Sequence, residues 1–302
     1  MILLKLNSRE LNQHFLRINQ YMILNYINWN PEPEIVNLFG ISIRYYGLLF
    51  VTGIFLCISI LGWIFKRENI PDANLEKLSF YGIVGILAGA RLGHCLFYEP
   101  AYYFSNPLEM ILPIKFLNEG GIKFTGYQGL ASHGGALGLI VALIIYSKKT
   151  KHAILDTIDL IAVVAALGGA FIRLANLMNS EIIGMPTTKP WGFVFQRVDL
   201  IPRHPAQLYE ALSYFLIFAI SFWLYKTKRE HLKNGFFFGL CLLLIFTARF
   251  FIEFLKERQV DFEANMQLDM GQLLSIPYIL VGLGFILYAF KKHKMLKVSP
   301  TI

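Results

Sequence analysis

Seven apolar runs, each close to the length of a membrane-spanning helix, constrain the fold of this chain more than any other feature. They occupy approximately residues 41–65, 78–98, 130–147, 156–178, 207–225, 235–256 and 271–290. About 20 consecutive apolar residues are needed for a helix to cross the hydrocarbon core of a bilayer. Because 55% of the 302 residues are hydrophobic, the runs are too many and too long for a soluble core. We therefore predict an all-α polytopic membrane protein with about seven transmembrane helices.

The residues before the first run are mixed in character. Residues 28–34 read NWNPEPE, and these prolines and charges do not favour a spanning helix. The start also lacks the apolar core and small-residue cleavage site of a secretory signal peptide. We expect residues 1–40 to form an extracytoplasmic segment, in which residues 1–21 are an extension before a second candidate start at Met22. Residues 41–290 are then the transmembrane domain, and residues 291–302 a basic cytoplasmic tail.

Lysines and arginines in the loops predict the orientation of the helices, because cytoplasmic loops are enriched in them. One set of loops holds Lys66, Arg67, Lys77, Lys148, Lys149, Lys151, Lys226, Lys228, Arg229, Lys233, Lys291, Lys292, Lys294 and Lys297. The other set, which is longer, holds Lys5, Arg9, Arg17, Lys115, Lys123, Lys189, Arg197, Arg203 and Arg258. We therefore expect the C-terminus in the cytoplasm, and the N-terminus outside with a periplasmic or extracellular head region.

Composition also excludes some classes of function. The formal net charge of +8 does not indicate nucleic-acid binding, because the basic residues form short clusters between apolar runs. Cys57, Cys95 and Cys241 all lie inside apolar runs and show no metal-ligand spacing. We expect no metal, no disulfide and no nucleic-acid partner.

The segment from residue 168 to residue 184, GGAFIRLANLMNSEIIG, places costly polar residues at the end of an apolar run. A cation such as Arg173 costs about 2.5–3.5 kcal/mol at the centre of a bilayer. At about 100° per residue, Arg173, Asn176 and Ser180 share one helix face, and Asn179 lies three residues from Asn176. Such a stripe faces protein or water. It indicates a functional site, or alternatively polar contacts that join helices.

Arg249 is a second arginine inside an apolar run. Glu253 and Lys256 follow at i+4 and i+7, which predicts a cation, a carboxylate and a second cation on one helix face. A buried ion pair that only offsets its own desolvation is the alternative interpretation. Two guanidinium groups opening toward one cavity would suit a phosphate diester, because each planar fork donates paired hydrogen bonds to phosphate oxygens.

His133 lies at the start of the third run, in the glycine-rich segment GYQGLASHGGALG at residues 126–138. A lone histidine is more often a packed residue than a catalyst, but an imidazole is a natural proton acceptor near neutral pH. Ser132 does not form a convincing dyad with it, because adjacent helical side chains point about 100° apart.

In their order and spacing these segments resemble prolipoprotein diacylglyceryl transferases over about residues 22–290. The most specific match is to the family signature R-x-[GA]-N-x-x-N-x-E-x-x-G, which is carried by Arg173, Ala175, Asn176, Asn179, Glu181 and Gly184. Supporting matches are Tyr46, Gly47, Arg91, His133, Gly134, Gly135, Arg203, Pro205, Gln207, Tyr209, Glu210, Arg249, Glu253, Gly271, Gln272, Ser275 and Pro277.

The chain departs from the family pattern at five positions. Ile172 replaces a usual glycine, Leu177 and Ser132 replace phenylalanines, Ile245 replaces a tyrosine, and Lys256 replaces an arginine. Lysine keeps the charge but loses the bidentate fork. These departures affect details of the lipid pocket, in particular any hydroxyl contact from the sixth run.

The resemblance implies that the transmembrane domain is catalytic and acts in the bacterial inner membrane without a cofactor. It would transfer a diacylglyceryl group from phosphatidylglycerol to the lipobox cysteine of a prolipoprotein signal peptide, releasing glycerol phosphate. The implied catalytic residues are Arg173 and Arg249 on the phosphate, Glu181 beside the headgroup, and His133 as the base, for which a carboxylate or water is an alternative. The implied substrate ligands are Tyr46, Arg91, Asn176, Asn179, Gly184, Arg203, Gln207, Tyr209, Glu210, Glu253 and Gln272.

Three other classes remain as rivals. A transporter for an anionic lipid or solute would bind its substrate with the same arginines, although the two halves of the chain show no inverted repeat of the arginine motif. An intramembrane serine protease is disfavoured by the spacing of Ser132 and His133. An assembly protein would use the polar groups only to join helices.

Overall fold

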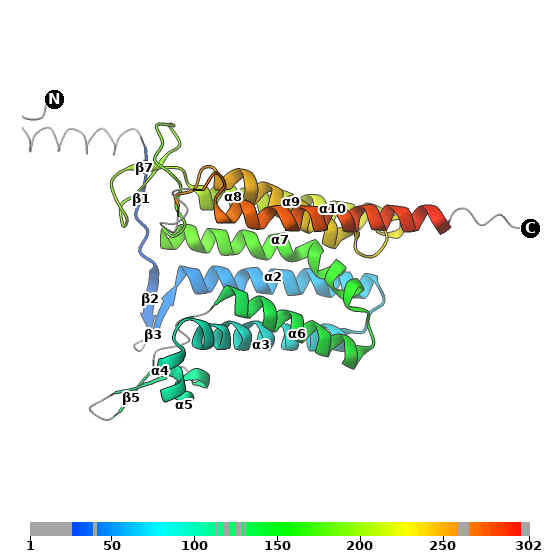
Figure 1. The fold of residues 1–302 in the computed structure, drawn as a ribbon, viewed down its shortest axis with the longest axis horizontal. Coiled ribbons are helices and arrows are strands. Elements are labelled where there is room, and N and C mark those ends of the chain that lie inside the picture. The colour runs from blue at the N-terminus through cyan, green and yellow to red at the C-terminus, as the bar shows by residue number, and fades with distance from the viewer. Residues whose placement is uncertain are drawn as a thin grey trace, which may run out of the picture. The chain divides into compact units, whose positions relative to one another are not determined.

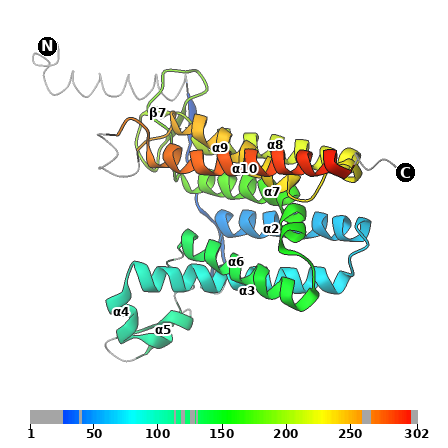
Figure 2. The same ribbon diagram turned by 45° about the vertical axis from the view of Figure 1, so that its right-hand side comes forward.

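The computed structural model describes residues 26–38, 41–112, 114–117, 121–124, 129, 131–258 and 266–296. The extension at residues 1–21 and the end of the basic tail lie outside the described residues. The chain divides into two compact units, the first from residues 1–57 and 159–302 and the second from residues 58–158. Each unit is built mainly of helices (Figures 1 and 2).

The predicted apolar runs all form helices. They are α2 (Tyr45–Arg67), α3 (Asp72–Phe97), α6 (Ser132–Thr150), α7 (Ile154–Asn179), α8 (Ala206–Lys228), α9 (Phe236–Glu253) and α10 (Met270–Leu296). Six of these helices are long and apolar enough to cross a membrane, whereas α6 does not reach that hydropathy. Histidine and glycines at the start of α6 and lysines in its last turn leave it a shorter apolar centre. The prediction of a helical, polytopic membrane protein is confirmed.

Shorter elements connect these helices. They are α4 (Pro100–Ser105), α5 (Pro107–Ile111), the single-turn helix η2 (Arg229–His231), β1 (Ile27–Trp29), β2 (Glu34–Leu38), β3 (Ile41–Arg44), β4 (Ile114–Phe116), β5 (Ile122–Phe124), β6 (Phe193–Phe195) and β7 (Pro202–Arg203). Strands β2 and β3 form one antiparallel hairpin, and β4 and β5 form another. Strand β6 lies between β1, which is parallel to it, and β7, which is antiparallel. The sequence did not predict these strands, because two to five residues are too few to show an alternating pattern.

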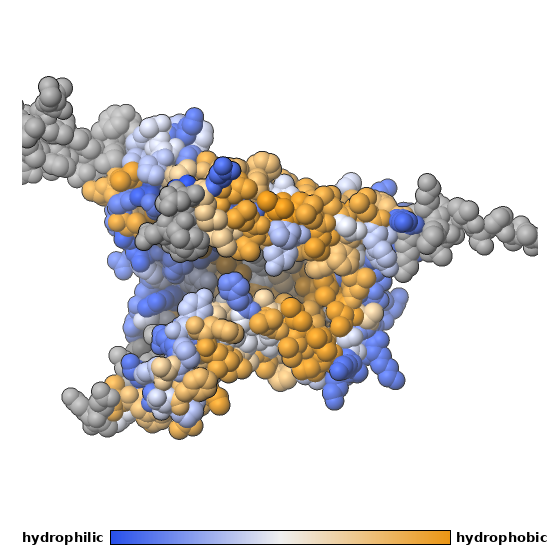
Figure 3. Space-filling model, in the orientation of Figure 1, coloured by the Kyte–Doolittle hydropathy of each residue, from blue (hydrophilic) through white to orange (hydrophobic). Residues whose placement is uncertain are grey.

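In the first unit, α7 packs against α8 and α9 through small and aromatic side chains. Ala166 and Ala170 of α7 meet Tyr214 and Ile217 of α8, and Ile245 of α9 packs against this cluster. Helices α9 and α10 lie side by side and approach closely where Gly239 faces Gly282. Their outer flanks carry mainly hydrophobic residues (Figure 3), as expected for helices that face lipid.

One buried carboxylate joins three segments at the other end of this helix group. Asp159 of α7 is fully buried and accepts a 2.9 Å hydrogen bond from the backbone N–H of Phe238, at the start of α9. Arg229, which follows α8, lies 3.8 Å from the other carboxylate oxygen. The carboxylate therefore caps a helix belonging to another part of the chain, where amide groups would otherwise lack acceptors.

In the second unit, α3 and α6 pack through glycines. Gly85, Gly89 and Gly93 recur every fourth residue of α3, and a Cβ atom at any of them would collide with α6 at Gly134 or Gly138. Small residues at this spacing let two helix backbones approach closely in a membrane. The interface fixes the first turn of α6, which carries His133.

Candidate functional site

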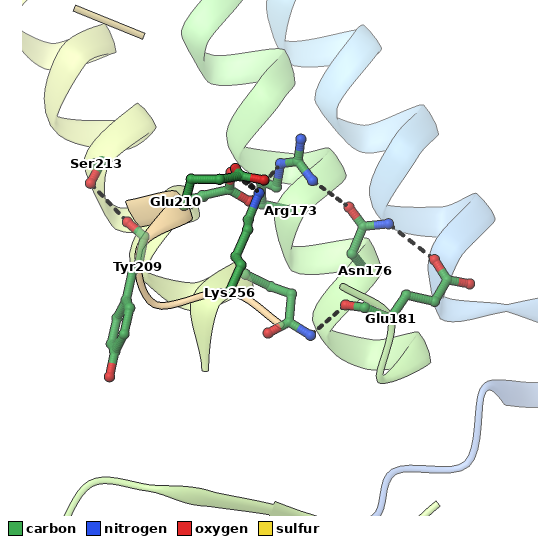
Figure 4. Close-up of polar contacts among 9 residues, drawn as sticks. Arg173, Asn176, Glu181, Tyr209, Glu210, Ser213 and Lys256 are labelled. Atoms are coloured by element: carbon green, nitrogen blue, oxygen red, sulfur yellow. Dashed lines mark hydrogen bonds and ion pairs between the residues drawn. The ribbon is translucent and has the colours of Figure 1, made fainter. Parts of the chain in front are cut away.

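The polar stripe predicted on α7 is present in the structure. The Nη1 group of Arg173 donates a 3.4 Å hydrogen bond to the side-chain oxygen of Asn176. The amide nitrogen of Asn176 then donates to Glu181 at 3.1 Å, and that of Asn179 donates to the other oxygen of Glu181 at 2.9 Å. Arg173, Asn176 and Glu181 therefore form one hydrogen-bonded chain (Figure 4), and Asn179 joins it at Glu181.

Glu210 of α8 lies at the centre of a buried charge network. Its carboxylate is 0% exposed and lies 3.1 Å from Nε of Arg173 and 2.9 Å from Nζ of Lys256 (Figure 4). Lys256 also pairs with Glu253 at 3.1 Å. Neither oxygen of Glu210 accepts a well-aligned hydrogen bond from the described residues, so charge attraction dominates these contacts. The charge network comprises Arg173, Glu210, Lys256 and Glu253.

The prediction that Arg249, Glu253 and Lys256 share one helix face is wrong for Lys256. Helix α9 ends at Glu253, so Lys256 lies beyond the helix, in a short bridge to Gly184, and not on the same helix face. From there it reaches back to the carboxylate of Glu253. In the part of the chain that the structure describes, the half-buried guanidinium of Arg249 has no ion pair or hydrogen bond.

Tyr214 of α8 interacts with both arginines. It forms a hydrogen bond with Arg173 and lies within electrostatic reach of both Arg249 and Glu210. Tyr46, at the start of α2, lies within electrostatic reach of Arg173 and Glu181. Arg173, Arg249, Glu181 and the two tyrosine hydroxyls thus belong to one neighbourhood of the first unit.

The turn that carries Glu181 has an unusual backbone. Ser180 and Ile182, on either side of Glu181, have φ angles of 56° and 57°. The left-handed region is costly for residues with a side chain, above all for β-branched isoleucine, at about 1–3 kcal/mol each. Gln207 of α8 donates a side-chain hydrogen bond to the backbone carbonyl of Glu181, which helps to hold the turn in this conformation.

Gly184 closes the signature where three backbone segments meet. Its N–H donates to the carbonyl of His204 at 2.9 Å, and the next N–H, of Met185, donates to Leu255 at 2.8 Å. A Cβ atom at Gly184 would collide with both of those carbonyl oxygens. Glycine is therefore required here by close approach of the backbone.

Arg203 ties the same three segments together from the outside. Its guanidinium contacts Asp199 at 2.6 Å and Glu257 at 3.0 Å, and donates a 3.2 Å hydrogen bond to the carbonyl of Gly184. Burial alone would raise the pKa of Asp199, but hydrogen bonds from Arg203 and from the Ile201 N–H lower that pKa below its usual value. The carboxylate is therefore held ionised beside Arg203.

Two further predicted substrate ligands contact protein groups. Tyr209 points away from the charge network (Figure 4), and its hydroxyl accepts a 2.9 Å hydrogen bond from the Trp191 ring. Gln272 accepts from the N–H of Asp269 at 3.0 Å, and so caps the start of α10. Beside it, a Cβ atom at Gly271 would collide with the carboxylate of Glu253.

Arg91 and His133 belong to the second unit. Arg91 is buried, donates to the backbone carbonyls of Glu109 and Met110 and lies over the ring of Tyr103, so it joins α3 to α5. His133 lies in the first turn of α6, and its side chain is exposed. The surroundings of Arg91 therefore support a structural role, whereas the His133 imidazole is accessible.

Sequence reasoning missed two contributors to the site. Lys256 was expected on the helix face of Arg249, but its ion pair with Glu210 was not, because it joins residues too far apart in the chain for any local pattern to show. Tyr214 lies four residues after Glu210 on α8, a spacing that places both side chains on one helix face. That spacing could have indicated from the sequence that Tyr214 lies near the site.

Comparisons with known proteins agree with this geometry. The family model described as prolipoprotein diacylglyceryl transferase matches residues 33–288. A phosphatidylglycerol–prolipoprotein diacylglyceryl transferase of Bacteroides fragilis is 58% identical over 269 residues, covering 89% of this chain and 97% of the relative. Proteins of the same name from Chloroherpeton thalassium and Tolumonas auensis are 40% and 42% identical, covering 91% and 87% of this chain and 98% of each relative.

Glu210→Gln should destabilise the protein strongly, because it removes the buried carboxylate that two cations share. Breaking one partner of a buried ion pair costs about 3–5 kcal/mol. The free energy of unfolding in detergent micelles measures this effect. The control is Glu257→Gln, whose carboxylate is 47% exposed and also contacts an arginine, so its loss should cost about 1 kcal/mol or less.

The free energy of unfolding of a double variant distinguishes the loss of a shared charge network from a local packing defect. The double variant Glu210→Gln, Lys256→Met should be destabilised by less than the sum of the two single variants, because the second change removes a cation that the first left unpaired. Equal costs for Glu210→Gln and Glu257→Gln, or strictly additive effects in the double variant, would contradict the central position of Glu210.

Proposed function

Because the chain belongs to the prolipoprotein diacylglyceryl transferase family, we propose that it transfers a diacylglyceryl group from phosphatidylglycerol to the lipobox cysteine of prolipoproteins. The observation that carries the proposal is that Arg173 and Arg249 lie in two membrane-spanning helices and both interact with Tyr214. Two guanidinium groups at that depth suit a phosphate that stays attached to its lipid.

At the reacting carbon, one bond forms and one breaks, and the thiol also gives up its proton to a base. The cysteine sulfur attacks the glycerol carbon that carries the phosphate, a C–S bond forms, and the C–O bond to phosphate breaks with its electron pair on oxygen. The products are a thioether and glycerol phosphate, and the thiol proton is released. The main electrostatic task is to stabilise the charge that grows on the leaving phosphate.

Arg173 and Arg249 are suited to that task in different ways. Arg173 is held by Glu210, Asn176 and Tyr214, and part of its five-donor fork remains for a phosphate oxygen. Arg249 has no partner among the described residues, so a phosphate would complete its hydrogen bonding. Glu210 and Lys256 act through Arg173 as positioning residues.

The other ligands divide by what they contact. Tyr46, Asn176, Asn179 and Glu181 lie along the polar chain that leads from Arg173, and we assign them to the headgroup. Arg203, Gln207, Tyr209, Gly184 and Gln272 bind or approach protein backbone and side chains, so they shape the site rather than contact the lipid.

His133 is assigned as the base that accepts the thiol proton. A thiol has an ordinary pKa of about 8.5, so at neutral pH it needs a base or a positive field to become the reactive thiolate. The exposed imidazole at the start of α6 meets that need, and the neighbouring glycines fix its helix. Glu181 is the next candidate.

The finer topology follows from loop charge. The chain is a multi-pass membrane protein. The denser lysines and arginines of one set of loops support a cytoplasmic C-terminus and an N-terminus outside. The signature turn then lies at the outer face of the bacterial inner membrane, where a secreted prolipoprotein presents its lipobox.

Arg173→Lys should lose most transfer activity while the protein still inserts, because lysine keeps the charge but not the planar fork. Purified protein is incubated with phosphatidylglycerol and a lipobox peptide, and mass spectrometry follows the diacylglyceryl mass added to the cysteine. Arg67→Lys, at the exposed end of α2, is the matched control and should keep parental activity. No modified peptide with the parent would refute the proposed function, and near-parental turnover by Arg173→Lys would exclude an essential guanidinium.

His133→Gln should slow transfer at pH 7 by about 10²–10⁴-fold, the usual contribution of a general base. Lipid binding should persist, and alkali should restore part of the rate between about pH 8 and 9.5, because the free thiol then ionises without help. The rate of peptide lipidation against pH measures this in both proteins. His231→Gln, on exposed η2, is the control. Parental activity of His133→Gln at pH 7 would reassign the base.

A reporter fused after Lys294 should be cytoplasmic, and one inserted near Asn118 should be periplasmic. The physical reason is the asymmetry of basic residues between the two sets of loops. Paired alkaline phosphatase and fluorescent protein fusions report each side of the membrane by their activity. The opposite pair of locations would overturn the orientation.

A further inference from the structure

A polar pocket opens beside Glu181 in the unit that holds the charge network. It is open to solvent, has a volume of about 370 Å³ and is lined by Glu32, Pro33, Glu34, Arg44, Asn179, Glu181 and Arg197. The lining comes from the β2–β3 hairpin and the residues before it, the turn after α7, and the loop after β6. Three carboxylates and two guanidinium groups therefore surround one small cavity.

Four of these charged side chains have no polar partner among the described residues. Glu32, Glu34, Arg44 and Arg197 form no hydrogen bond or ion pair with the described residues. This holds even though Glu34 and Arg44 are opposite each other in the register of the hairpin. Their donors and acceptors are thus available to whatever fills the pocket.

Because the pocket is lined by both carboxylates and guanidinium groups, it favours some classes of ligand over others. A phosphate offers only acceptors and would meet three carboxylates, whereas an ammonium offers only donors and would meet two guanidinium groups. A hydroxyl group both donates and accepts, so it can bind a carboxylate and a guanidinium at once. A polyol therefore fits this lining better than either ion.

The pocket is also connected to the phosphate-binding residues. Glu181 lines it and accepts a hydrogen bond from Asn176, which accepts one from Arg173. In phosphatidylglycerol the terminal glycerol is joined directly to the phosphate, so its hydroxyls lie only a few bonds from the phosphate oxygens. A headgroup whose phosphate is held by Arg173 can place its glycerol toward Glu181.

We propose that this pocket binds the two free hydroxyl groups of the phosphatidylglycerol headgroup and thereby selects the donor lipid. The proposal rests on the proposed function and adds the part of the substrate that the pocket recognises. It makes Glu34 and Arg197 specificity determinants that lie outside the family signature.

The test compares two donor lipids that differ only in these hydroxyls, phosphatidylglycerol and phosphatidylpropanol with the same acyl chains. The purified full-length protein transfers to a lipobox peptide, and kcat/KM is measured for each lipid. The parent should prefer phosphatidylglycerol by about tenfold or more, as expected for one or two hydrogen bonds to charged groups. Glu34→Ala and Arg197→Ala should each bring the ratio to within about threefold, because the glycerol lipid loses its advantage.

Glu76→Ala is the matched control, since Glu76 is exposed on α3 and belongs to the second unit. It should keep the parental ratio. An unchanged ratio in both pocket variants would overturn the proposal, and so would variants that change only the KM of the peptide, which would assign the pocket to the prolipoprotein.

A measurement of lipid binding without turnover distinguishes failure of this proposal from failure of the proposed function. Native mass spectrometry measures how much of each lipid remains bound to the parent and to the pocket variants, without any turnover. If the parent transfers neither lipid, the proposed function fails, and the bound ratio still decides the pocket. Equal retention of both lipids by the parent would overturn hydroxyl recognition.

Discussion

The carboxylate of Glu210 between two cations is the interaction on which the rest of the site depends. An isolated carboxylate or ammonium in a region of low dielectric constant costs several kcal/mol, and that cost is offset only when opposite charges are held close. Arg173 comes from α7, Glu210 from α8, and Lys256 from the segment after α9. The pairing therefore constrains three parts of the chain at once. Its main consequence is that these segments can pack in only one way, because a shift of any one of them would leave a buried charge without its partner.

The helices and the signature were predictable because their signals are local. An apolar run of about 20 residues leaves few alternatives in a membrane, and polar residues within such a run stand out. The structure accordingly matches the predicted runs, including α6, whose apolar centre is shorter. The placement of Lys256 on the helix face of Arg249 and Glu253 failed for the opposite reason. It assumed that α9 continues to Lys256, whereas the helix ends at Glu253 and the chain turns toward Gly184.

Long-range contacts were beyond reach of the sequence. The roles of Gln207 and Arg203 appear only when α8 and the preceding loop are placed beside the signature turn. The structure also shows what surrounds two of the residues that depart from the family pattern. Leu177 packs with Ile183 and Phe195 beneath the turn, and Ile245, where a tyrosine is usual, packs against the cluster that contains Tyr214. Tyr214 thus supplies a hydroxyl near both arginines from a different helix.

Glu181 links the buried network to the open pocket because its backbone is forced into position. Left-handed conformations at Ser180 and Ile182 together cost about 2–6 kcal/mol, which no isolated turn would sustain. The Gln207 hydrogen bond, the close approach at Gly184 and the contacts of Arg203 offset that cost. The resulting turn directs an exposed carboxylate toward two amides of α7, and these amides lead to Arg173. A headgroup with hydroxyls beyond its phosphate could therefore contact this turn and Arg173 together, which is the arrangement that the proposed selection of the lipid requires.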